Sequence, residues 1–95
     1  MPATFALHPN HPNPFNPSTT IRYDLPEDSH VSLVIYDVLG RKVAEVINEV
    51  QGAGYKSVTW DASAVASGVY LARFMAIDEN GSLKLSKTMK LVLAK

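Results

Sequence analysis

Two histidines near the N-terminus are the first candidates for chemistry. His8 and His11 are three residues apart, a spacing that would place both imidazoles on one face of a helix, where they could share a metal ion. Pro9 and Pro12 exclude that helix, because proline lacks the backbone N–H and forces an extended geometry on the residue before it. Residues 1–21 also contain no Asp or Glu that could complete a ligand set. The histidine pair therefore does not predict a metal site.

Other reactive residues are equally isolated. Asp24, Glu27 and Asp28 surround Pro26 as solvated turn residues do, and calcium loops need a denser alternation of oxygen ligands. The chain contains no cysteine, which excludes a thiolate nucleophile, a disulfide and a cysteine metal site. No glycine-rich phosphate loop follows any apolar run. We therefore expect no catalytic residue, no metal, no cofactor and no small-molecule substrate, so that the protein is not an enzyme.

Length and charge narrow the class of protein further. A chain of 95 residues makes one small domain. Nine Lys and Arg balance nine Asp and Glu, so no overall field attracts nucleic acid or an anionic bilayer, and we expect no nucleic-acid partner. No apolar run approaches the roughly 18 residues of a spanning helix, and the N-terminus lacks the features of an export signal. Met1-Pro2-Ala3 suggests the start of a fragment expressed from a longer chain.

The first 21 residues predict a docked, extended lead-in. They contain no charged side chain but hold five of the six prolines, which exclude a helix. Leu7, Phe15 and Ile21 stand between the prolines and are apolar enough to be buried. We expect residues 1–6 to be a linker or the start of the expressed fragment, and residues 7–95 to form the folded domain.

The rest of the chain alternates short apolar runs with turn residues, a rhythm typical of sandwiches and barrels. Residues 20–25 alternate cleanly, as half-buried strands do, and residues 31–36 form a second run with Val31, Leu33 and Ile35 expected inward. Asp37-Val38-Leu39-Gly40 predicts a hairpin turn, because Asp accepts from the backbone and Gly adopts positive φ. Asp78-Glu79-Asn80-Gly81 predicts the last hairpin, between Gly68–Ile77 and Leu83–Leu93.

Three segments are harder to assign. Residues 42–50 carry apolar side chains at helical spacing, yet they follow a hairpin turn, are rich in β-branched residues and lack a helix N-cap, so we predict a strand that could be bulged. In residues 55–60, Tyr55 competes with Val58 and Trp60 for the inward face, and the phase stays open. Asp61–Ser67 is a crossover that could hold one helical turn capped by Asp61.

These elements predict an all-β fold, an Ig-like Greek-key antiparallel β-sandwich of about seven short strands. The residues expected to supply most of its core are Ile21, Tyr23, Leu33, Ile35, Val58, Trp60, Val69, Leu71, Leu91 and Leu93.

The last run carries one charge asymmetry. Residues 83–95 contain Lys84, Lys87, Lys90 and Lys95 but no acid. Lysines commonly protect an edge strand against pairing with another chain, and they could also be recognised by a receptor; both interpretations can hold at once. Leu91 and Leu93 alternate with Lys90, Val92 and Lys95, so one face could anchor the strand while the other displays charge.

Four motifs follow one another along the chain. They are Pro12-Asn13-Pro14-Phe15-Asn16-Pro17-Ser18-Thr19-Thr20-Ile21-Arg22-Tyr23, then Tyr36-Asp37-Val38-Leu39-Gly40-Arg41-Lys42-Val43, then Trp60-Asp61-Ala62 with Ser67-Gly68-Val69-Tyr70, and finally Lys87–Lys95. In this order they resemble the type A C-terminal sorting domain of the type IX (Por) secretion system. The Ig-like domain of flagellar hook-capping proteins is a related pattern.

The resemblance implies a non-catalytic module that directs a secreted cargo through the type IX system, by way of the periplasm, to the cell surface or the exterior. It implies two kinds of partner, the outer-membrane secretion and surface-attachment machinery and a covalently linked cargo domain on the N-terminal side. The residues that would form the recognition signal are Gly68, Tyr70, Lys87, Lys90, Leu91, Val92, Leu93 and Lys95. The structural motif residues are Pro12, Asn13, Pro14, Phe15, Asn16, Pro17, Asp37, Gly40, Trp60 and Asp61.

Two other functions remain open at this point. The chain could be a carbohydrate-binding module if Tyr36, Tyr55, Trp60 and Tyr70 formed a flat platform for sugars. It could also be a passive Ig-like spacer domain of a larger extracellular protein.

Overall fold

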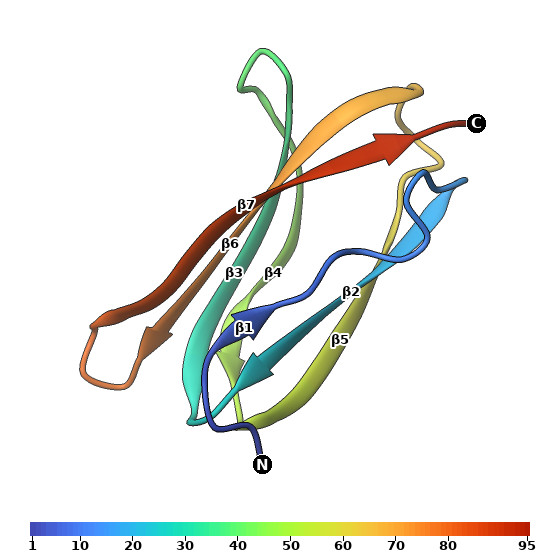
Figure 1. The fold of residues 1–95 in the computed structure, drawn as a ribbon. Helices are drawn as coiled ribbons and strands as arrows, with labels where there is room; N and C mark the ends of the chain where they lie inside the picture. Colours follow the sequence, from blue (N-terminus) through green and yellow to red (C-terminus); the bar gives the residue numbers. More distant parts are fainter.

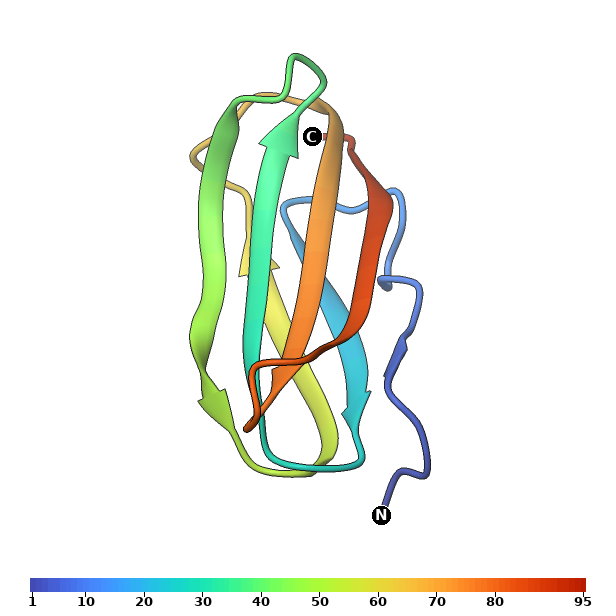
Figure 2. The same cartoon turned by 90° about the vertical axis from the view of Figure 1, so that its left-hand side faces the viewer.

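The computed structural model describes residues 1–95 as two β-sheets packed face to face (Figures 1 and 2). The strands are β1 (Ala6–Leu7), β2 (Ser18–Leu25), β3 (Ser29–Asp37), β4 (Lys42–Gln51), β5 (Gly54–Asp61), β6 (Gly68–Asp78) and β7 (Leu83–Leu93). One sheet has the order β1-β2-β5 and the other β4-β3-β6-β7, with antiparallel pairing throughout. The predicted all-β, Ig-like sandwich of seven strands is confirmed.

The chain crosses repeatedly between the two sheets, which gives the Greek-key connectivity. Consecutive strands β2 and β3 lie in different sheets, as do β4 and β5 and again β5 and β6. No helix long and apolar enough to cross a bilayer is present.

Strands β2 and β3 bury their alternate residues as predicted. Ile21, Tyr23 and Leu25 on β2 are at most 1% exposed, and Val31, Leu33 and Ile35 on β3 are completely buried. Because side chains alternate across a strand, these sets face each other between the two sheets. They form the centre of the core, and the ring of Tyr23 packs against Phe74 of β6 at 5.1 Å between centroids.

The predicted inward face of β6 is wrong. Val69 is 38% exposed and Leu71 is half-buried on the outer face, while Tyr70 and Phe74 turn inward. The set that contains Val69 and Leu71 is mostly apolar, but it also contains the exposed Arg73, and this set turns outward. The inner set combines two large rings with Ala72 and Ala76, and these alanines leave room for the large residues of the opposite sheet. Of the other predicted core residues, Val58 is half-buried at the edge of the core.

Strand β4 is a strand with two bulges, which confirms the prediction for residues 42–50. Its pairing with β3 shifts between Leu33 and Val34 and again between Ile35 and Tyr36, which leaves Val46 and Val43 as extra residues. Each extra residue changes the alternation by one position. This converts the spacing of a strand into the helix-like spacing seen in the sequence, and Ile47 is the fully inward residue at 6% exposed.

Trp60 determines which of the two alternating sets of β5 faces the core, a point that the sequence left open. Trp60 is 7% exposed and faces the core, whereas Tyr55 is 71% exposed and faces solvent. The connection after β5 holds a hydrogen-bonded turn, in which the Val65 N–H donates to the Ala62 carbonyl at 3.1 Å, and not the helical turn considered above. Asp61 still caps this turn by accepting from the Ser63 N–H at 2.9 Å.

Candidate functional site

The four sequence motifs meet at one end of the sandwich, here called the motif end and comprising residues 12–17, 37–40, 60–70 and 90–95. Strand pairing brings them together: Asp37 lies opposite Tyr70, Gly68 opposite Leu93, and Ser18 opposite Asp61. Figure 1 shows the β3–β4 turn, the β5–β6 connection and the C-terminus at this end, with the N-terminus at the other. Residues far apart in the sequence therefore form one continuous surface.

The proline-rich lead-in closes part of the edge of β7. The Phe15 N–H donates to the Val92 carbonyl and the Ala94 N–H to the Phe15 carbonyl, both at 2.9 Å. The Asn13 side chain accepts from the Val92 N–H at 3.0 Å and donates to the Lys90 carbonyl at 3.4 Å. The outward backbone groups at this end of β7 thus already have partners.

The lead-in is also tied to the other sheet, which confirms that it is docked. The Phe15 ring is 2% exposed and lies 5.9 Å from the Trp60 ring. Pro12 accepts from the Thr19 hydroxyl at 2.9 Å, and Pro17 accepts from the Ala62 N–H at 2.9 Å. The remaining residues of this motif, Pro14 and Asn16, are exposed.

The rest of the β7 edge is open. Strand β7 is the outer strand of its sheet and pairs only with β6. The backbone N–H and C=O of Val92 point away from β6. In an antiparallel ladder the backbone groups of every second residue point to the same side, so those of Thr88 and Ser86 also point away from β6. Both residues are exposed, and no other part of the chain bonds to their outward backbone groups. The open edge therefore runs from Ser86 to the N–H of Lys90.

The lysines of this strand occupy different environments. Lys84 pairs with Asp78 at 3.5 Å, whereas Lys87 and Lys90 are exposed and have no carboxylate within ion-pair distance. Lys90 lies on the outer face, while Lys87 has the phase of the buried Leu91 and therefore leaves the strand on the inner side. Charge on the inner side of an edge strand discourages pairing with another chain.

Lys95 does not share the exposed face with Lys90, which corrects the predicted alternation. It lies beyond the end of β7, where its ammonium group donates to the carbonyls of Ser63, at 2.8 Å, and Val65. Its N–H donates to the Ser67 hydroxyl at 3.0 Å. Lys95 thus holds the β5–β6 connection against the end of β7. Leu91 and Leu93 are buried as predicted, at 0% and 2% exposed.

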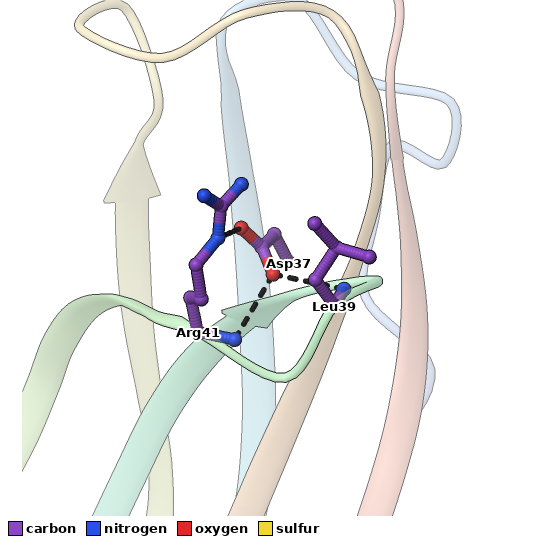
Figure 3. A network of polar contacts seen from close by, with 3 residues as sticks. All are labelled: Asp37, Leu39 and Arg41. Carbon is purple, nitrogen blue, oxygen red and sulfur yellow. Dashed lines mark hydrogen bonds and ion pairs between the residues drawn. The ribbon is translucent and has the colours of Figure 1, made fainter.

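The β3–β4 turn is organised by one carboxylate, as Figure 3 shows. Asp37 accepts from the N–H groups of Leu39 and Arg41 at 2.9 and 3.0 Å and from the Arg41 side chain at 2.8 Å. These donors, the Arg41 N–H foremost, lower the pKa of Asp37 below its usual value. Gly40 has φ of +82°, which confirms the predicted turn. Val38 is 67% exposed at its tip.

Gly68 and Tyr70 shape the start of β6. Gly68 has φ of +154°, a conformation that residues with a Cβ rarely adopt. The Tyr70 ring is 8% exposed and meets Trp60 edge to face, and its hydroxyl donates to the Ala66 carbonyl at 2.5 Å. Both residues therefore hold the backbone that carries the end of β7.

The side chains considered for other functions are not brought together. No group of three or more His, Asp or Glu side chains gathers to hold a metal ion. The aromatic platform of the carbohydrate-binding alternative is not formed, because Trp60 and Tyr70 are in the core and Tyr36 is only half-exposed. Tyr55 alone presents its ring to solvent.

Comparison with known proteins yields a matching family and similar solved structures. The family described as "Secretion system C-terminal sorting domain" matches residues 11–90. CopC from Methylosinus trichosporium OB3b is similar in structure, with a TM-score of 0.62 and 18% identity over 94% of this chain and 92% of that one.

The other structure is dimeric latent PorU from Porphyromonas gingivalis, with a TM-score of 0.66 and 23% identity over 98% of this chain. This chain spans only 10% of PorU. Both structural likenesses show a shared fold. No curated protein sequence matches the chain.

Proposed function

This chain belongs to the family of secretion system C-terminal sorting domains, and we propose that the secretion machinery recognises its strand β7 within the folded sandwich. Domains of this family direct a secreted cargo protein through the type IX secretion system to the cell surface or the extracellular space, and this is the role of the chain. The family is non-catalytic in general. The cargo would be joined on the N-terminal side. The expected boundary between a linker (residues 1–6) and the sorting unit (residues 7–95) falls within β1, and Phe5 packs against the core, so we place the end of the linker before Phe5.

The open edge of β7 is the observation that carries the proposal. A machine that exports many unrelated cargoes can recognise only what their sorting domains share, namely backbone groups and a few fixed side chains. The edge from Ser86 to Lys90 offers free N–H and C=O groups to which an extended segment of the receptor could add as a strand. Lys87 and Lys90 lie beside this edge without acidic partners, so they would select a receptor segment that carries carboxylates.

The other predicted signal residues would act by holding this strand in place. Leu91 and Leu93 anchor it in the core, and Gly68 and Tyr70 fix the neighbouring end of β6. Lys95 fastens the β5–β6 connection. The protective and the receptor interpretations of the lysines are compatible, because a charge that repels a second copy of the strand can attract an acidic partner.

The test is export of a reporter fused to residues 1–95 in a host that has the secretion system. Lys87→Glu combined with Lys90→Glu should leave the reporter in the periplasm with little change in melting temperature, because exposed charges contribute little to stability. Lys42→Glu combined with Lys56→Glu makes the same change of charge on other strands and should be exported normally. Deletion of residues 91–95 is a weaker test, since it also removes Leu91 and Leu93 from the core. Normal surface display of the β7 variant would refute the proposal.

A further inference from the structure

A shallow hollow lies on the outer face of the three-stranded sheet, towards the end opposite the motif end. It is lined by His8, Pro9, Arg22, Asp24, Tyr55 and Lys56. Asp24 and Tyr55 are direct cross-strand partners, and they adjoin the turn end of β2 and β5, where Leu25 pairs with Gly54. In Figure 1 no segment of the chain lies beyond β2 and β5 on this side. None of its lining residues belongs to the proposed sorting signal.

One side of the hollow presents hydrogen-bonding groups held in place. His8 Nε2 and Asp24 Oδ2 are 3.0 Å apart, and the His8 N–H donates to the Arg22 carbonyl at 2.9 Å. The histidine is thereby fixed at both its backbone and its ring. The other carboxylate oxygen of Asp24 has no partner within the chain, so it is free to accept from a ligand hydroxyl.

The hollow also carries unpaired positive charge. Arg22 has no carboxylate within ion-pair distance, although three ion pairs form elsewhere in the chain. Lys56 lies opposite the inward-facing Tyr23, so its side chain leaves the strand on the other side of the sheet. The only acid that lines the hollow, Asp24, is already engaged by His8. The hollow therefore has an unpaired positive charge, which a ligand with an anionic group would complement. A carboxylate matches the two parallel N–H donors of the Arg22 guanidinium.

Tyr55 supplies the apolar contact. Tyr55 is 71% exposed, whereas Phe15, Tyr23, Trp60, Tyr70 and Phe74 are buried. An exposed ring bordered by charged and hydrogen-bonding groups offers a surface on which the C–H face of a sugar can pack.

The sheet continues from the hollow as a strip of hydroxyl side chains. Ser57 lies opposite Arg22, and Thr20 lies opposite Thr59, with their hydroxyl oxygens 3.2 Å apart. From Tyr55 to Thr59 the strand rises by about 13 Å, which is longer than one sugar ring. The strip can therefore hydrogen-bond further rings of the same ligand.

We propose that the hollow binds an acidic oligosaccharide, with Tyr55 packing on one ring, Arg22 binding its carboxylate, and Asp24 with His8 binding its hydroxyls. Binding at this place is independent of recognition at β7. It also differs from the four-aromatic platform considered above, since it needs only the one exposed ring.

The test is a titration of the 95-residue chain followed by two-dimensional amide NMR spectra. Trigalacturonate should cause saturable shifts confined to residues 7–9, 22–24 and 55–59, with a dissociation constant in the millimolar range typical of shallow sites. Maltotriose, which has no carboxylate, and acetate, which has no sugar, should each bind about tenfold more weakly, since each lacks one half of the contacts. Equal affinity for maltotriose or for acetate would overturn the proposal.

Variants separate a built site from general attraction between charges. Tyr55→Ala and Arg22→Gln should each weaken trigalacturonate binding about tenfold, and both residues are exposed, so the fold should survive. Lys42→Gln removes an exposed cation from β4 and should leave the affinity unchanged. If all three variants bind alike, or if the shifts follow the lysines over the whole surface, the hollow is not a saccharide site. Export of a reporter by Tyr55→Ala, measured separately, shows that the two functions are distinct.

Discussion

Replacing Phe15 by alanine tests whether the lead-in is part of the domain core. The Phe15 ring is 2% exposed and packs beside Trp60, between the two sheets. Its backbone bonds to Val92 and Ala94 involve only main-chain atoms, so an alanine can still make them. The substitution therefore removes the ring and leaves a cavity without deleting the hydrogen bonds that fasten the lead-in.

The expected loss of stability is large. Truncation of a buried Phe to Ala typically costs about 3–5 kcal/mol, and a domain of this length has a free energy of unfolding of roughly 5–14 kcal/mol. At about 4–8 °C per kcal/mol, the melting temperature should fall by at least about 12 °C. Phe5→Ala is the matched control, because Phe5 is half-buried at the rim of the core. It should cost no more than about 1.5 kcal/mol.

Urea unfolding followed by circular dichroism measures the loss in free energy of unfolding for Phe15→Ala and for Phe5→Ala. Amide hydrogen exchange at Val92 reports whether the lead-in stays on β7. If the lead-in docks as part of the core, Phe15→Ala lowers the midpoint and leaves the slope of the transition nearly unchanged. If the lead-in were only loosely attached to the domain, it would detach in the variant, and the loss in free energy of unfolding would be limited to the contacts of the lead-in. A loss as small as that of Phe5→Ala, together with fast exchange at Val92, would refute the reasoning.

Three further changes have defined outcomes. Gly68→Ala should cost about 1 kcal/mol in urea unfolding because of its φ of +154°, whereas Gly52→Ala, which has no positive φ, should cost less. The pKa values of Asp37 and Asp78 are lowered mainly by backbone N–H donors, so the stability that they contribute is present above the unfolded pKa of about 4 and is lost as the pH falls below it. Asp37→Asn combined with Asp78→Asn should therefore lose less stability between about pH 5 and pH 2 than the unchanged chain does. Melting temperatures measured at pH steps of about 0.5 check this. Lys95→Met should speed amide exchange in residues 62–67 while barely changing the melting temperature, since its ammonium group holds only that connection.

The parts of the fold that the sequence predicted well are those determined by nearby residues. In β2 the residues that alternate with Ile21, Tyr23 and Leu25 are all polar, so only one phase buries the apolar face. In β3 the run of Val31, Leu33 and Ile35 gives the same signal, although Val34 lies on the other face. The turns at Asp37 and Asp78 are likewise local, because each carboxylate accepts from N–H groups two and four residues further on. Such signals need no knowledge of the other strands.

The phase of β6 is only weakly indicated by its own residues. Val69 and Leu71 are as apolar as the residues that alternate with them, and only Arg73, in the same set, indicates that this set turns outward. The same limit applied to β5, where the outward placement of Tyr55 depends on Trp60 reaching Phe15 across the sandwich. The saccharide hollow was therefore not predictable, since it requires Tyr55 to face outward beside Asp24.

The state of the β7 edge depends on contacts across almost the whole chain. Asn13 and Val92 are 79 positions apart, and their bond decides where the open edge ends. The sequence predicted a lysine-bearing edge strand, but it did not distinguish Lys90, which is free, from Lys95, which is bound to backbone carbonyls. Regular alternation cannot describe Lys95, because the residue lies past the end of the strand.

The motif residues consequently divide into two groups with different consequences for recognition. Phe15, Trp60 and Tyr70 are buried against one another, so a receptor could not touch them without opening the sandwich. Opening it would require much of the free energy of unfolding, which binding at a single strand edge would have to supply. We infer that these residues preserve the shape of the motif end, while direct contact falls to Lys87, Lys90 and the backbone between them. A sorting signal of this kind is a property of the folded domain, and an unfolded peptide with the sequence of β7 should compete poorly for the receptor.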